Sequence, residues 1–312
     1  MSTTIQTREV DFQHIRYPVM RSGIVTSFKR AIILGPLFAL WACAPVFAQK
    51  DIAGEWDNRF DEDFLERIPG PDIGDYLGIP LNDAARRHAD SWDASLLTLP
   101  EHQCKPHPSD YGIRGPAQMR VWKEMDTVAQ TLIAYHTHIF WQAPERVIWM
   151  DGRAHPPDYV PHTWQGFSTG KWEGDVLTIT TTHLKTGWIR RNGIPRSENA
   201  VITEHWVRHG KYLTVATIVN DPVYLTEPFI RTTDFVANPD QQIPAYPCES
   251  VVEIDRPQGA VPHHLPGTNP FLAEFAQRFG VPVEATRGGA ETMYPEYRLK
   301  MKNFPKTTKA AQ

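Results

Sequence analysis

Histidines, acids and an arginine occur close together in the middle of the chain, in a pattern that suits proton transfer. Asp151, Arg153 and His155 occupy alternate positions of a proline-containing segment, the kind of connection on which binding groups are often mounted. Histidine titrates near neutral pH, and a carboxylate can orient it. We expect His155 or His136 to act as a base, with Glu204 or Asp151 as its acid or orienting partner. Arg153 would hold a developing negative charge.

The same segment and the connection after it carry further groups suited to binding a small molecule. His162 and Trp164 follow in the segment, and His183 opens the next long connection. Together they could form the rim of a site, although a well-packed loop without chemistry would have the same composition. The expected substrate-binding residues are Arg153, His162, Trp164, His183 and Trp206.

His136 and His138 stand at i and i+2 of an expected strand, so their side chains point to the same side. Two histidines could share a zinc or copper ion, but such a centre needs a third ligand that the spacing does not supply. We therefore expect acid–base work at His136 and His138, with no metal and no organic cofactor. A metalloenzyme with histidine ligands is an alternative, and ordinary hydrogen-bonded histidines are another.

Strand alternation places Glu204 among apolar side chains. A turn at His209-Gly210 would pair Glu204 with Val215 and Trp206 with Leu213, all on one face. A lone buried charge is costly, so Glu204 should either form a salt bridge with an inward basic residue or serve a binding cavity. A register slip of one residue would turn every side chain over.

Seven β-branched and aromatic runs follow one another without intervening helices, which predicts a mainly β protein. Short hairpin connections favour an antiparallel up-and-down, lipocalin-like barrel over a sandwich. The expected strands are Met119–Met125, Thr131–Trp141, Arg146–Met150, Val176–Thr182, Ala200–Arg208, Tyr212–Asn220 and Pro228–Phe235, with a last short one at Val251–Ile254.

Regions of different character flank the barrel. A helix should begin at Asn82 or Asp83, and a second should run from Asn269 to Gly280, with its aromatic face against the barrel wall. The expected organisation is an N-terminal extension with signal peptide at 1–48, an irregular, partly helical region packing on the barrel at 49–117, the barrel at 118–256, and a C-terminal helix and tail at 257–312.

Residues 31–48 form an apolar stretch that follows basic residues and ends in small ones, as in a cleavable secretory signal. We expect cleavage near Ala48, a periplasmic or secreted protein, and no stable membrane span afterwards. Lipid attachment at Cys43 is an alternative. The true start is either Met1 or Met20, because Met20 would give the signal an ordinary length.

The mature chain keeps two cysteines, Cys104 and Cys248. In an oxidising compartment a disulfide between them is expected, contributing about 2–4 kcal/mol. The alternative is a metal site, because Cys104 stands between His102 and His107 in an H-x-C-x-x-H arrangement.

Composition excludes some partners. The chain has 312 residues, with 32 basic and 36 acidic ones and a net charge of −4. Since no long basic run is present, there is no electrostatic footprint for nucleic acid. No phosphate-binding glycine loop follows a plausible strand, so nucleotide binding is not expected.

Two segments resemble a signature shared by a large group of secreted bacterial proteins of unassigned function. They are Asp151-Gly152-Arg153-Ala154-His155-Pro156 and the stretch from Trp164 to Leu177, WQGFSTGKWEGDVL. The resemblance covers residues 100–255, with further matches at Ser197-Glu198, Glu204 with Trp206, and Asp221-Pro222. It implies a barrel-like fold and secretion, but no reaction. His136 or His138 stands where the group's pattern has an acid, which would fit a specialised member.

Two kinds of function fit these features. The first is an enzyme that performs cofactor-independent acid–base chemistry, of lyase, hydratase or isomerase type, on a small apolar or aromatic molecule inside the barrel. The 10 tryptophans and 13 histidines of the chain supply stacking walls and groups that titrate near neutrality. The second is a periplasmic binding or carrier protein that holds such a ligand unchanged.

Overall fold

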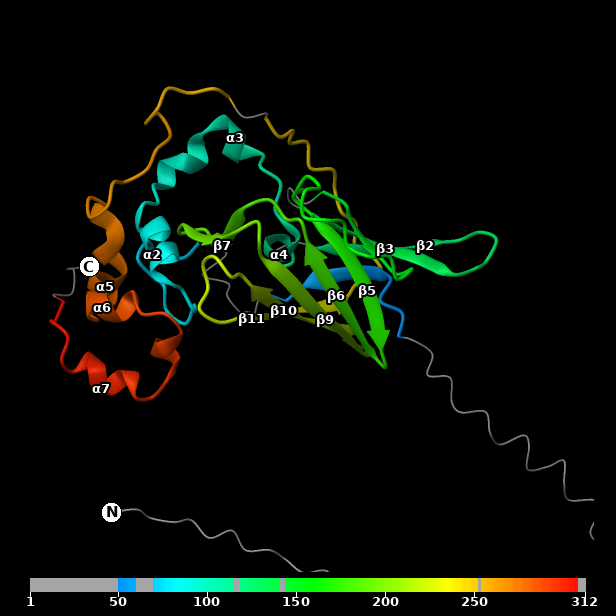
Figure 1. Ribbon diagram of the computed structural model, residues 1–312. Helices are drawn as coiled ribbons and strands as arrows, with labels where there is room; N and C mark the ends of the chain where they lie inside the picture. The colour runs from blue at the N-terminus through cyan, green and yellow to red at the C-terminus, as the bar shows by residue number, and fades with distance from the viewer. Residues whose placement is uncertain (1–49, 60–69, 115–117, 141–143, 252–253, 308–312) are drawn as a thin grey trace, which may run out of the picture. The chain divides into compact units, whose positions relative to one another are not determined.

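The computed structural model describes residues 50–59, 70–114, 118–140, 144–251 and 254–307 (Figure 1). The expected signal peptide, its cleavage site and the alternative start and lipid sites all fall outside these residues. The described residues belong to one unit, Ala48–Gln312. Within them, no helix has the length and apolar character needed to cross a membrane.

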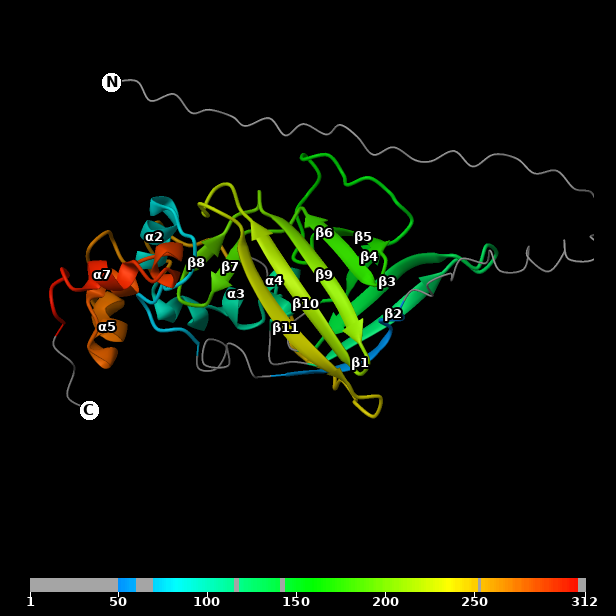
Figure 2. The ribbon, with the colours of Figure 1, turned by 90° about the horizontal axis from the view of Figure 1, so that it is seen from below.

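Nine strands of the described chain close into a barrel, which confirms the predicted mainly β fold (Figures 1 and 2). The neighbours run in the order β1-β11-β10-β9-β6-β5-β4-β3-β2, and β1 closes the ring by pairing with β2. All neighbours are antiparallel except β4 and β5, which are parallel. The strands are Gly54–Asn58 (β1), Met119–Met125 (β2), Leu132–Ile139 (β3), Arg146–Trp149 (β4), Phe167–Glu173 (β5), Val176–Thr182 (β6), Val201–His209 (β9), Tyr212–Asn220 (β10) and Phe229–Ala237 (β11).

Alternate residues of each strand point inward and form one contiguous apolar cluster. On β6, for example, Leu177 and Ile179 are fully buried, whereas Thr178 and Thr180 between them are half-buried on the outer face. The barrel thus has the period of two that the sequence pattern indicates. Large inward side chains of this cluster include Trp56, Met119, Tyr135, Ile148, Trp206 and Phe235.

Two barrel strands lie where the sequence pattern did not predict strands. The first, β1, comes from the region 49–117 that we expected to be irregular and to pack on the barrel, yet it pairs with both β2 and β11. The second, β5, ends at Glu173 in a segment read as a connection, because its glycines and lysine hide the alternation. The expected strand at 251–254 is absent at both of its described ends, Val251 and Ile254.

The β9–β10 hairpin keeps the predicted faces but shifts the register. Its turn is Gly210-Lys211, so Glu204 lies opposite Thr217 and not Val215. Gly210 has φ +65°, the left-handed conformation that a two-residue hairpin turn favours. Because the shift is two residues, Glu204 still points inward.

A second apolar core lies at one end of the barrel, between α2 and the separate β7–β8 hairpin. The helix α2 is capped as predicted, since the Asn82 side chain accepts a hydrogen bond from the Ala85 N–H. These elements are Asp83–Asp90 (α2), Ala94–Thr98 (η1), Pro100–Gln103 (α3), Ser109–Gly112 (α4), Gly187–Arg190 (β7) and Ile194–Arg196 (β8).

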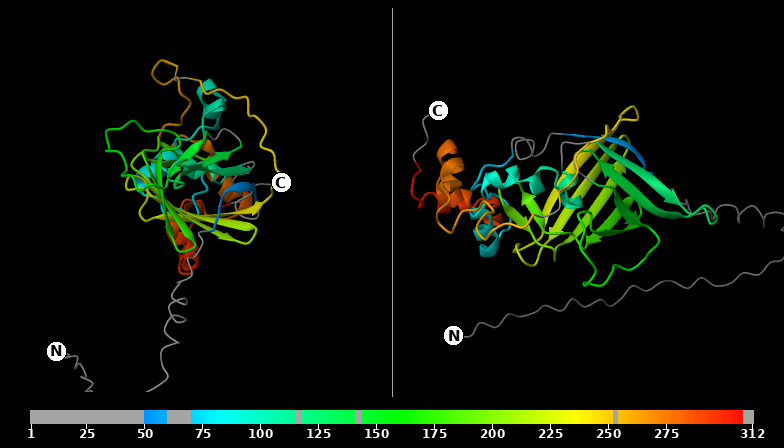
Figure 3. Two further views of the ribbon diagram at one scale, coloured as in Figure 1. Left: turned by 90° about the vertical axis from the view of Figure 1, so that its right-hand side faces the viewer. Right: turned by 90° about the horizontal axis from the view of Figure 1, so that it is seen from above.

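The C-terminal helix is present, but it lies beside α2 and not against the barrel wall (Figures 1 and 3). Asn269 donates to the backbone carbonyls of Asp90 and Trp92 and fixes the start of the helix there. The side chains of Phe271 and Phe279 remain 41% and 57% exposed, so the aromatic face is not a barrel contact. The C-terminal elements are Pro270–Ala273 (η2), Glu274–Phe279 (α5), Val283–Thr286 (α6), Ala290–Met293 (η3) and Tyr297–Met301 (α7).

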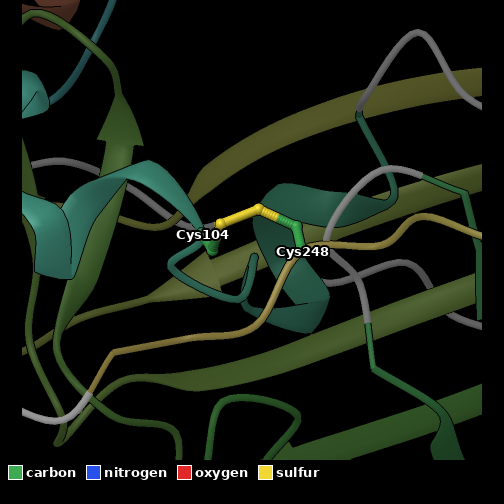
Figure 4. Close-up of a disulfide and its surroundings, with 2 residues drawn as sticks. All are labelled: Cys104 and Cys248. Atoms are coloured by element: carbon green, nitrogen blue, oxygen red, sulfur yellow. A yellow bond between two sulfur atoms is a disulfide. The ribbon is translucent and has the colours of Figure 1, made fainter.

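The predicted disulfide between Cys104 and Cys248 is present, with Cα atoms 5.5 Å apart (Figure 4). It ties the end of α3 to the long irregular segment that leads from β11 to the C-terminal helices. Arg256 forms an ion pair with Glu101 on the same short helix, at 2.6 Å. The bonded Cys104 cannot be a metal ligand, so the H-x-C-x-x-H metal site is wrong.

Candidate functional site

The parallel strands β4 and β5 lie beside a groove of about 570 Å³. The lining draws on both faces of the barrel wall beside the end of β4. Thr169, Thr178 and Thr180 are on the outer face of β5 and β6, whereas Met150 and Trp172 pack against the inner apolar cluster. This position differs from the expectation of a cavity enclosed by the barrel. The full lining is Leu132, Met150, Gly152, Arg153, Thr169, Gly170, Lys171, Trp172, Glu173, Thr178 and Thr180.

Both segments of the predicted signature meet at this groove. Gly152 and Arg153 come from the first segment, and residues 169–173 come from the second. Gly152 takes φ +77°, a conformation that lets the chain turn back over the sheet after β4. The groove thus combines cations, hydroxyls, an apolar wall and the carboxylate of Glu173, which pairs with Lys171 at 3.2 Å in an exposed ion pair.

Arg153 is held in place from two sides. Its guanidinium carbon lies 3.4 Å from the ring centroid of Trp149, and its Nε and Nη2 groups donate to the Asp151 carboxylate at 2.5–3.0 Å. These bonds lower the pKa of Asp151 and raise that of Arg153, so both groups stay charged. These bonds use Nε and Nη2 and leave Nη1 of Arg153 for a ligand, with Asp151 as the orienting partner.

His155 connects the loop to the sheet. Its Nδ1 lies 2.8 Å from the Thr182 hydroxyl, and its Nε2 lies 2.9 Å from the Thr169 hydroxyl. The Phe167 ring meets the imidazole edge-on at 5.3 Å. Partial burial, with a smaller contribution from His183, lowers the pKa of His155 and favours the neutral ring. Both ring nitrogens are therefore engaged, which leaves neither open as a free base.

His183 and His162 extend this cluster away from the groove. His183 is 8% exposed, bonds Thr182 at 2.7 Å through Nδ1, and donates from Nε2 to the Pro157 carbonyl at 3.2 Å. His162 bonds the carbonyl of Leu184 at 3.0 Å, and its ring lies 5.2 Å from that of His183. The structure thus brings together three of the predicted histidines, although they line no common cavity with His136.

His136 and His138 share a side of β3 as predicted, but that side is the outer face of the barrel. His136 stacks on Trp122 with ring centroids 5.3 Å apart. Its Nδ1 lies 2.5 Å from Glu145, and its Nε2 lies 2.8 Å from Glu124. Burial lowers the pKa of His136, but hydrogen bonds to the two carboxylates outweigh it and raise the pKa overall. Burial and nearby positive charge lower the pKa of His138.

Glu204 and Trp206 are the predicted site residues that lie inside the barrel, with exposures of 1% and 0%. Glu204 forms an ion pair with Arg146, which also donates to the hydroxyls of Ser168 and Thr181 at 3.0 and 2.8 Å. The ion pair with Arg146 is the inward salt bridge that the sequence analysis gave as one of two alternatives for Glu204. Neither residue lines the groove.

Trp164, predicted to bind substrate, belongs to an aromatic and cationic cluster beyond the histidines. The ammonium groups of Lys105 and Lys185 lie 5.2 and 5.1 Å from the centroid of its ring. Lys105 also lies 5.1 Å from the Trp188 ring. Gln165 donates to the His107 carbonyl and anchors this end of the loop.

The sequence reasoning missed Trp149, Thr169 and Lys171. Thr169 and Lys171 lie inside the tryptophan-glycine segment of the resemblance, which was the one available signal. No sequence pattern identifies Trp149, because its contribution to the site depends on Arg153, whose guanidinium packs on the Trp149 ring. Across the described ranges, no three histidine, cysteine, aspartate or glutamate side chains gather in a way that could hold a metal ion.

Fold and site together define a closed β-barrel protein with an open groove in its wall, lined by polar and apolar side chains. No protein-family model matches the sequence, and neither does any curated protein or solved structure. The resemblance to the group of secreted bacterial proteins therefore stays an expectation.

Proposed function

We propose that this protein is a binding or carrier protein for a small molecule with an apolar or aromatic body and an anionic group. The observation that supports this most is the meeting of Arg153 and Lys171 in one groove whose wall includes Leu132, Met150 and Trp172. The cations suit a carboxylate, the apolar wall suits the body of the ligand, and the volume lies within the usual range for small-molecule sites.

The hydrogen-bonding state of the candidate bases favours binding over catalysis. His155 has both nitrogens bonded, His136 is clamped by two carboxylates, and Glu204 is paired inside the barrel. A general base needs an atom within reach of the proton it removes. Export to the periplasm or the medium is part of the proposal, since disulfides such as that of Cys104 persist in oxidising compartments.

Calorimetric titration with 3-phenylpropionate and with 3-phenylpropan-1-ol tests the proposal, since the two probes differ chiefly in the charged end. The acid should bind at least about tenfold more tightly, and Arg153→Gln or Lys171→Gln should each remove about that factor for the acid alone. Lys211→Gln, on the β9–β10 turn, is the matched control. Equal affinity for acid and alcohol would refute the proposal, and the acid should be recovered unchanged.

An acid–base enzyme of lyase, hydratase or isomerase type is the second candidate, and one contact favours it. The Thr169 hydroxyl lines the groove and lies 2.9 Å from His155 Nε2, where a reacting group could exchange a proton. Substitution His155→Gln separates the two functions. An enzyme would lose turnover while keeping its affinity, whereas a binding protein would show only a graded loss of affinity.

A further inference from the structure

A chain of hydrogen bonds leads from the groove into the loop that covers it. Thr169, in the groove lining, contacts His155 Nε2 at 2.9 Å, and His155 Nδ1 contacts Thr182 at 2.8 Å. The Thr182 hydroxyl contacts His183 Nδ1 at 2.7 Å, and His183 Nε2 contacts the Pro157 carbonyl at 3.2 Å. Two imidazoles and two hydroxyls thus alternate between the groove and a backbone carbonyl.

The carbonyl at the far end sets the direction of every bond. A carbonyl oxygen only accepts, so His183 Nε2 carries a proton, and in the neutral ring Nδ1 is the acceptor. Thr182 has a single hydroxyl proton and gives it to His183, so its oxygen accepts from His155 Nδ1–H. His155 Nε2 is then the acceptor, and Thr169 donates its one proton to it.

The surroundings fix the positions of these groups. His183 has φ +58°, a left-handed conformation that costs a non-glycine residue about 1–2 kcal/mol, and its ring bonds at both ends compensate. Gly166 lies so close to the Thr182 carbonyl that an added Cβ would be 2.5 Å away. Burial keeps the pKa of His155 low, which preserves the neutral ring that the alternation requires.

We propose that Thr169, with its only proton committed to His155, turns acceptor lone pairs toward the groove and selects ligands that carry a hydrogen-bond donor as well as an anionic group. The substrate class narrows to hydroxy or amino carboxylates with an apolar body. The part of this inference that concerns ligand selection rests on the proposed function. The direction of the hydrogen-bond chain does not depend on the proposed function.

Long-range proton–nitrogen correlation spectra test the direction without any ligand. The proton should be on Nδ1 in His155 and on Nε2 in His183, with signals assigned through the His155→Gln and His183→Gln variants. A proton on Nε2 of His155 would overturn the proposal, because Thr169 would then accept from the ring and keep its own proton for the groove.

Ligand selection is tested by titrating racemic 3-phenyllactate against 3-phenylpropionate, which lacks the hydroxyl. The hydroxy acid should bind about tenfold more tightly. Thr169→Val should abolish this preference, so that the two acids bind with similar affinity. Thr214→Val, on the outer face of β10 and two strands away from β6, should keep it. Equal binding of the two acids to the unmodified protein, or a preference that survives Thr169→Val, would overturn the selection. If neither acid binds, the proposed function fails and only the direction of the chain stands.

Discussion

Arg146 and Glu204 form an ion pair inside the barrel, although two strands, β5 and β6, separate their own strands in the ring. Ser168 on β5 and Thr181 on β6 complete the contact by accepting from the same guanidinium. One buried arginine therefore links four neighbouring strands through their inward side chains.

Removing one partner of this pair should destabilise the protein strongly. Glu204→Leu leaves Arg146 charged and buried, and we expect it to lower the free energy of unfolding by about 3–5 kcal/mol. The double variant Arg146→Met with Glu204→Leu should recover most of that loss, because no unpaired charge remains. Urea titrations of the three proteins measure both effects. A double variant no more stable than the single one would show that the pair does not behave as a unit.

Gly166 and Gly174 both have positive φ, +68° and +61°, but they differ in their surroundings. A Cβ on Gly174 meets nothing within 4 Å, whereas one on Gly166 meets the Thr182 carbonyl at 2.5 Å. Gly174→Ala should cost about 1 kcal/mol for its backbone conformation, and Gly166→Ala about 1–3 kcal/mol more for the clash. Thermal unfolding of both variants measures the difference, and equal losses would contradict it.

Replacing both Cys104 and Cys248 with serine should lower the free energy of unfolding by about 2–4 kcal/mol, because the disulfide closes a loop with a sequence separation of 144. Denaturant titration with and without dithiothreitol checks this. The reductant should weaken the unmodified protein and leave the double variant unchanged. A variant that still responds to reductant would mean that the loss has another origin.

His136 should make stability depend on pH. Its folded pKa is raised above 6.5 by the bonds to Glu124 and Glu145, so its contribution is fully present below pH 6.5 and is lost as pH rises through the folded value. Between pH 6.5 and the raised pKa of His136, the unmodified protein should therefore lose stability relative to His136→Gln. Unfolding titrations from pH 5.5 to 8.5 measure this loss, with His209→Gln, at the exposed end of β9, as control. If the stability of the unmodified protein and of His136→Gln changes with pH in the same way, the predicted effect of the bonds to Glu124 and Glu145 is wrong.

Alternation along single strands was enough to predict the barrel and the inward position of Glu204. It could not predict register, because a shift of two residues preserves the faces, and the β9–β10 turn moved from His209-Gly210 to Gly210-Lys211 in this way. The strand β1 was not predicted, because its five residues lie in a region rich in proline, glycine and aspartate.

The candidate site was predicted only in part, for a physical reason. Asp151, Arg153 and His155 were recognisable because they are close in sequence and chemically distinctive. The outer face of the sheet also contributes Thr169 and Lys171, which look like ordinary solvent-facing positions of a strand until the loop is known to fold over them. The sequence analysis also placed the site inside the barrel, whereas the groove lies in the barrel wall beside the end of β4, a position that strand alternation does not describe.

The direction of β5 has a structural consequence for the loop before it. Since β5 runs parallel to β4, the chain must leave one rim of the barrel and return to the opposite rim before it can re-enter the sheet. That return needs only about 13 Å, the length of a four-residue strand, yet residues 150–166 are available for it. Most of the connection is thus longer than the topology requires, and this extra length carries residues that contact the outer face of β5 and β6, such as His155.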